Sequence, residues 1–142
     1  MNEPWNSLRH HLRQRFGDQR IVKIPIDAGL SCPNKDGRFG NRGCLFCDSY
    51  GAGPVDVGQL TVGEQIDRFT RRRPGCRFTA YFQAHANTYA PLSRLRLLYE
   101  PVVGRTDMVG LALATRPDAI AEEVFSYLEE LGRQTWLTVE LG

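Results

Sequence analysis

Three of the four cysteines of this chain lie in one short stretch. Cys32, Cys44 and Cys47 fall within residues 27–48, with eleven residues between the first two and two between the last two. Glycine and turn-forming residues fill the same stretch, so we expect an irregular loop. Thiolates ligate zinc and iron–sulfur clusters, and a closed structural zinc site takes four protein ligands. Three thiolates from one loop therefore predict a metal centre with one free coordination position.

Other residues of the loop and the remaining cysteine have simpler expected roles. Asn34 and Asp36 are expected to shape the loop, with side chains bonded to nearby backbone amides. Cys76 follows a basic run and is expected to be structural. Tyr81 is expected in the core.

Composition places the chain among ordinary globular domains. Its 142 residues are 42% apolar and 24% charged, with a net charge of +2, which gives no strong signal for nucleic acid. No run of about 18 apolar residues predicts a membrane helix, and basic residues interrupt the N-terminal segment where a secretion signal would lie. We therefore expect a cytoplasmic protein, and in a reducing compartment clustered cysteines favour metal binding over disulfides.

The elements that must position the loop alternate along the chain. Trp5, Leu8, Leu12 and Phe16 recur at helical spacing, and Gly17 ends that short helix. Apolar runs predict four strands, at residues 21–26, 78–83, 108–114 and 136–141. Helices are expected from a capping box at 61–64 to about residue 72, from 91 to Pro101, and from 117 to 132. Strict alternation predicts an α/β fold with about four parallel strands and helices outside.

Four strands do not close a barrel, and a fourth strand without a following helix leaves an open edge. We therefore expect residues 1–142 to be either the N-terminal part of a longer domain, without the C-terminal half of its barrel, or a half-barrel that needs a partner. The first alternative is favoured. Pro25 in the first predicted strand indicates a strand end or a sheet edge.

Polar residues follow each predicted strand. Sites in parallel α/β folds form where strands end, so this rule groups the cysteine loop with three further sets of side chains. Those sets are Gln83, His85, Asn87, Thr88 and Tyr89 after the second strand, Thr115, Arg116 and Asp118 after the third, and Glu140 at the end of the fourth. Together they outline a cofactor pocket.

Four motifs in order resemble the radical S-adenosylmethionine (radical SAM) superfamily. They are CPNKDG followed by GCLFC, then YFQAHANTYAP, then ATRPD, then TVELG, and the resemblance runs from about Ile21 to Gly142. The match is to the YhcC-like branch, related to the radical SAM domain of the Elongator catalytic subunit. The usual superfamily spacing has three residues between the first two cysteines, and the longer gap here is typical of that branch. The resemblance implies a partial (β/α) barrel of the TIM type.

The resemblance also implies roles for individual residues. Cys32, Cys44 and Cys47 would ligate three irons of a 4Fe–4S cluster, leaving the fourth iron for S-adenosyl-L-methionine (SAM). Phe46 would lie against the adenine, and Glu140 would bind the ribose hydroxyls. Side chains near the SAM amino and carboxylate groups would be Gln83, Asn87, Thr88, Thr115 and Arg116.

The chemistry implied is reductive cleavage of SAM to a 5′-deoxyadenosyl radical that abstracts hydrogen from a substrate. An electron donor such as flavodoxin or ferredoxin would be a partner. The resemblance does not imply a substrate. A related domain works on tRNA, and tRNA is a possible substrate of this chain by analogy alone.

Two other functions remain open. A zinc-binding module could use the three loop cysteines with His85 and contact nucleic acid through arginines; iron with sulfide would favour the radical SAM enzyme, and one zinc would favour this module. A catalytically silent fragment could bind a cluster and cleave nothing.

Overall fold

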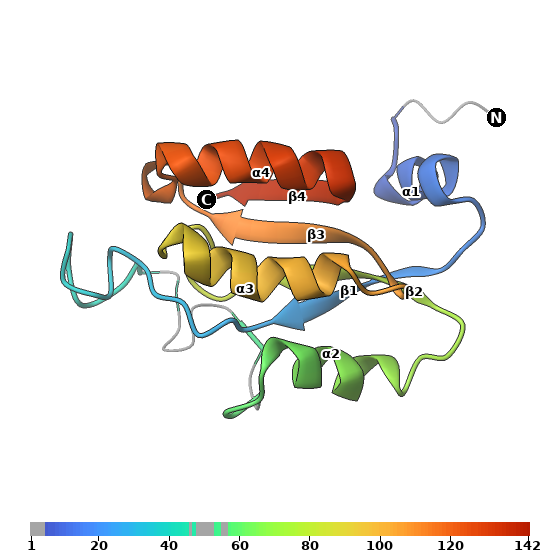
Figure 1. The fold of residues 1–142 in the computed structure, drawn as a ribbon, viewed down its shortest axis with the longest axis horizontal. Helices are drawn as coiled ribbons and strands as arrows, with labels where there is room; N and C mark the ends of the chain where they lie inside the picture. Colours follow the sequence, from blue (N-terminus) through green and yellow to red (C-terminus); the bar gives the residue numbers. More distant parts are fainter. Residues whose placement is uncertain (1–4, 46, 48–52, 55–56) are drawn as a thin grey trace.

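A four-stranded sheet with helices against it forms the framework of the chain (Figure 1). The computed structural model describes residues 5–45, 47, 53–54 and 57–142. The elements in order are α1 (Leu8–Phe16), β1 (Ile21–Ile26), α2 (Val62–Thr70), β2 (Arg77–Phe82), α3 (Leu92–Val103), β3 (Met108–Thr115), the 3-10 turn η1 (Pro117–Ala119), α4 (Glu122–Gln134) and β4 (Trp136–Leu141).

All neighbouring strands are parallel, in the order β1-β2-β3-β4. The predicted α/β class, the four parallel strands and the short leading helix are therefore confirmed. Pro25 lies in β1, an edge strand, as expected of a residue without a backbone donor. None of the helices in the described part of the chain has the length and hydropathy that crossing a bilayer requires.

Helices α2, α3 and α4 lie on one side of the sheet (Figure 1). The core forms between them and the sheet, where Ile24, Phe82, Leu111 and Leu113 are almost fully buried. Side chains alternate between the two faces of a strand, so β3 directs its leucines at the helices and its small residues at the other face. Those small residues are Gly110, Ala112 and Ala114.

Helix ends follow the local sequence. The Ser7 side chain accepts a hydrogen bond from the backbone of His10 at the start of α1, and Gly17 ends that helix with φ of 71°. At α2 the predicted capping box is confirmed, because Thr61 and Glu64 each bond the other's backbone N–H.

The prediction that Pro101 ends its helix is wrong. Pro101 lies inside α3, which continues to Val103, and Gly104 N–H still bonds the Glu100 carbonyl. A proline this late in a helix removes one backbone bond, to the carbonyl of Leu97. Because Leu97 is exposed, water can hydrate that carbonyl.

The predicted continuous helix over 117–132 is also wrong. The structure divides it into η1 and α4, and α4 runs past Gly132 to Gln134. The Thr88 hydroxyl donates to the Ala119 carbonyl at 2.8 Å. That carbonyl would otherwise accept a bond from the next helical turn, so a contact from another part of the chain separates the two elements.

Candidate functional site

The cysteine loop follows β1 and is built from tight turns. The Cys32 carbonyl accepts bonds from Lys35 N–H and Asp36 N–H at 2.8 and 3.1 Å, and Cys47 N–H bonds the Cys44 carbonyl at 3.1 Å. Asp36 accepts a bond from the Arg38 backbone, as predicted. The Asn34 side-chain Nδ2 donates to Cys44 Sγ at 3.0 Å, a contact with the thiol that sequence reasoning did not predict.

One cavity of about 530 Å³ joins the loop to the carboxyl ends of the strands. Seven predicted site residues line it: Cys32, Cys44, Cys47, Gln83, Thr115, Arg116 and Glu140. His85, Asn34 and Lys35 line it as well. Phe46 lies outside the described residues. The strand-end rule therefore brought together residues up to 108 positions apart, from Cys32 to Glu140.

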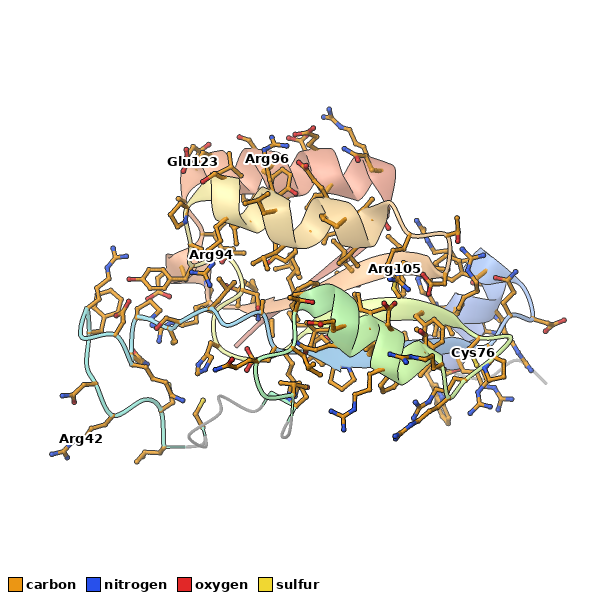
Figure 2. The ribbon with its side chains drawn as sticks, turned by 60° about the horizontal axis from the view of Figure 1, so that its bottom comes forward. Arg42, Cys76, Arg94, Arg96, Arg105 and Glu123 are labelled. Atoms are coloured by element: carbon orange, nitrogen blue, oxygen red, sulfur yellow. The ribbon has the colours of Figure 1, made fainter. Side chains whose placement is uncertain are left out.

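The three loop thiols share this cavity without meeting at one point. Among the described residues, no group of three His, Cys, Asp or Glu side chains could hold a single metal ion. Burial raises the pKa of the Cys47 thiol, and the neighbouring Cys44 raises it further. Cys76, the fourth cysteine, lies at the opposite end of the sheet, far from Arg42 of the cysteine loop (Figure 2).

Arg116 reaches the cavity from the end of β3 in a fixed orientation. Its Nε and Nη2 donate to the two carboxylate oxygens of Asp118 at 2.8 and 2.7 Å. The hydrogen bond with Asp118 is the main cause that raises the pKa of Arg116, and a contact with Cys32 adds to it. A bidentate pair of this kind restricts the planar guanidinium, which is suited to binding a carboxylate.

Asn87 and Thr88 do not line the cavity. Asn87 is fully buried, and its Nδ2 donates to three backbone carbonyls, those of Phe82, Ala84 and Ala114, at 2.8 to 3.0 Å. Thr88 Oγ1 bonds Thr115 Oγ1 at 2.6 Å. Both side chains therefore hold the turn after β2 against the end of β3, which positions Gln83 and His85 at the cavity.

His85 has a backbone conformation that few side chains adopt. Its φ is 64°, and among the described residues it is the only non-glycine with positive φ. Backbone strain of this kind is commonest at functional sites, and His85 lines the cavity.

Glu140 is held by Lys23 and Tyr81, a contact that sequence reasoning missed. The prediction that Tyr81 lies in the core is wrong, because its half-buried side chain is on the other face of the sheet and bonds Glu140. Lys23 Nζ donates to Oε1 at 2.9 Å, and the Tyr81 hydroxyl donates to Oε2 at 2.5 Å. These bonds, that of Lys23 first, hold the pKa of Glu140 below its usual range. Burial and then Glu140 raise the pKa of Tyr81 to about 12. The sequence feature that could have indicated a role for Lys23 is its position as the one charged residue in the apolar run IVKIPI.

A second cavity, of about 540 Å³, lies between α2 and α3. Its described lining contains no cysteine or histidine, and its charged members are Asp27 and Arg105. The cavity at the cysteine loop therefore concentrates the residues suited to chemistry.

The chain is similar to proteins from bacteria and an archaeon. It is 38% identical over 143 residues to the uncharacterized protein YtqA of Bacillus subtilis, covering 97% of this chain and 44% of that protein. It is 34% identical over 135 residues to protein YhcC of Escherichia coli, covering 92% and 43%. For the uncharacterized protein MJ0486 of Methanocaldococcus jannaschii the identity is 32% over 142 residues, covering 93% and 42%.

No protein-family model and no solved structure matches the chain. The chain spans less than half the length of the curated relatives it matches.

Proposed function

We propose that this chain is part of a radical SAM enzyme that binds a 4Fe–4S cluster through Cys32, Cys44 and Cys47 and binds SAM beside it. The observation that supports this proposal most is the shared cavity, in which three thiols of one loop face the polar ends of β2, β3 and β4. The similarity to E. coli YhcC is in keeping with the branch that the motifs resemble. A bound cluster would supply the electron for reductive cleavage of SAM.

Three thiols from one loop match the cluster that the resemblance implies, in which SAM would take the fourth iron. In a cluster each thiolate would bind a different iron, so the three thiols would surround the cluster and would not meet at one atom. Asn34 donates to Cys44 Sγ, and a donor to the sulfur is one of the contacts that adjust cluster potential. Gly43, at φ of 74°, lets the chain turn between Asn34 and Cys44.

The strand-end residues would bind the cofactor's polar groups. The Arg116 guanidinium, restricted by Asp118, matches the SAM carboxylate, and the Glu140 carboxylate matches the ribose hydroxyls. Gln83 offers an amide to the amino group. Asn87 and Thr88 would act through the backbone, since their own side chains are bonded within the fold.

The sheet itself fits a partial barrel. On the helix side of β1, Ile24 and Ile26 are 1% and 0% exposed because α2 covers them, whereas Val139 and Leu141 of β4 are 37% and 60% exposed. We expect a further strand and helix to cover the β4 edge in the complete enzyme, and an electron donor such as flavodoxin or ferredoxin to reduce the cluster.

A zinc site is the second candidate, because His85 lines the cavity with the three cysteines and Cys₃His is a zinc donor set. The four side chains would have to come closer together than they lie in this structure. Zinc uptake with no iron or sulfide, lost in His85→Ala, would favour it.

The radical SAM proposal is tested directly by reconstituting the cluster anaerobically, adding SAM and dithionite, and measuring the products of SAM cleavage. We expect the wild type to form 5′-deoxyadenosine and methionine in a one-to-one ratio. Cys76→Ala should form both products as well, and Cys47→Ala should form neither. Cys76 is a matched control because it is a partly buried thiol at the other end of the sheet. A loaded wild type that yields no 5′-deoxyadenosine would contradict cleavage by this chain.

A further inference from the structure

Three polar side chains from three strands meet on the sheet face opposite the helices. Lys23 of β1 and Tyr81 of β2 both donate to the carboxylate of Glu140 in β4. The Lys23 ammonium also lies 4.5 Å from the centre of the Tyr81 ring. Each pair of the three is therefore in contact, and we call them the Lys23–Tyr81–Glu140 network.

The network spans the whole sheet, because β2 and β3 lie between β1 and β4. Three strand spacings amount to about 14 Å, which long side chains bridge only by leaning toward each other. Small residues of β3 allow this: Ala112 pairs with Tyr81 in the sheet register, and Ala114 pairs with Glu140. A larger side chain at Ala112 would stand between Tyr81 and β4.

Of the three side chains, Glu140 alone lines the cavity. Lys23 donates a hydrogen bond to one carboxylate oxygen of Glu140 and Tyr81 donates to the other, which fixes the plane of the carboxylate. Both oxygens keep further lone pairs that can accept hydrogen bonds. A carboxylate fixed in this way can accept bonds from hydroxyl donors without losing side-chain freedom when the ligand binds.

We propose that Lys23 and Tyr81 are positioning residues, which hold the Glu140 carboxylate in the orientation that accepts a hydroxyl of the ligand in the cysteine cavity. The assignment rests on the proposed function, in which that ligand is SAM. Neither residue would touch the ligand, so both should act only through Glu140.

The test is SAM binding to the cluster-loaded chain by calorimetry. We expect Lys23→Met and Tyr81→Phe each to weaken binding by roughly tenfold at unchanged iron content, since each removes a bond to a charged group. Lys23→Arg should restore most of the affinity. Adding Lys23→Met to Glu140→Gln should weaken binding no further than Glu140→Gln alone, because the effects of residues acting as one unit are not additive.

Two variants match these changes away from the cavity. Arg133→Met removes the cation of the exposed Arg133–Glu129 pair on α4. Tyr127→Phe removes a buried hydroxyl that has no hydrogen-bond partner among the described residues. Both should bind SAM as the wild type does.

The outcomes separate the two claims. Equal SAM affinity in the wild type, Lys23→Met and Tyr81→Phe would overturn the positioning assignment and leave the proposed function intact. A cluster-loaded wild type that binds no SAM would overturn both. In the cluster-free chain, a thermal double-mutant cycle should show coupling between Lys23 and Glu140, and independent effects there would overturn the network itself.

Discussion

The contact between β3 and β4 at Gly110 makes a sharp prediction for Gly110→Ala. A Cβ at this position would lie 2.3 Å from the backbone oxygen of Trp136 and 3.1 Å from its Cβ. The obstructing atom is backbone in the paired strand, since Gly110 and Trp136 are register partners. Restoring ordinary contact would separate the strands by roughly 1 Å.

The expected cost of Gly110→Ala follows from where β3 lies. Because β3 is paired on both sides, it cannot move away from β4 without disturbing β2. Inserting a methyl group into such a site costs about 1–3 kcal/mol, and the backbone contact places this one at the upper end, about 3 kcal/mol. That is a large part of a typical stability of roughly 5–15 kcal/mol and corresponds to a Tm about 10 °C lower.

Urea unfolding followed by circular dichroism measures this effect, and Gly63→Ala is the matched control. A Cβ at Gly63, within α2, meets nothing within 4 Å. Alanine should therefore stabilise that helix by about 0.5–1 kcal/mol. A Gly110→Ala protein with the unfolding midpoint of the wild type would refute the proposed close approach.

Two further predictions concern buried and paired groups. Asn87→Ala leaves three carbonyls without their side-chain donor, so the free energy of unfolding should fall by about 3 kcal/mol with or without cofactor. A loss of SAM binding at unchanged stability would instead indicate that the Asn87 side chain contacts SAM directly. The hydrogen bond from Arg105 holds the pKa of Asp107 below its usual range. The ionised Asp107 therefore stabilises the fold fully above the ordinary carboxyl pKa, and this stabilisation is lost as the pH falls through the lowered pKa. Asp107→Asn should therefore make the free energy of unfolding depend less on pH on the acid side. An unchanged acid side would contradict that contribution.

Local patterns predicted most of the fold. Apolar runs predicted every strand in the described part of the chain, because each strand lies within one run of mostly apolar residues. The capping box at Thr61 and the edge position of Pro25 depend on residues next to each other, so they were also readable. Pro101 and the break before α4 were not, since solvent at Leu97 and a bond from Thr88 decide them.

The candidate site was predictable in its location and less so in its detail. The strand-end rule needs only strand order, and it grouped Gln83, Thr115, Arg116 and Glu140 with the cysteines. Which way a side chain points after a strand depends on the turn, and the turn after β2 directs Asn87 and Thr88 into the fold. Lys23 was missed because it lies within β1, where the strand-end rule does not apply, and contacts Glu140 across two intervening strands.

Metal and sulfide content tests the central claim most directly. The wild type and the Cys47→Ala and Cys76→Ala variants would be reconstituted anaerobically with iron, sulfide and zinc present together. We expect about four irons and four sulfides per chain in the wild type and in Cys76→Ala, and loss of both in Cys47→Ala with helix content retained. One zinc per chain without sulfide, or full iron in Cys47→Ala, would contradict a cluster held by the three loop cysteines.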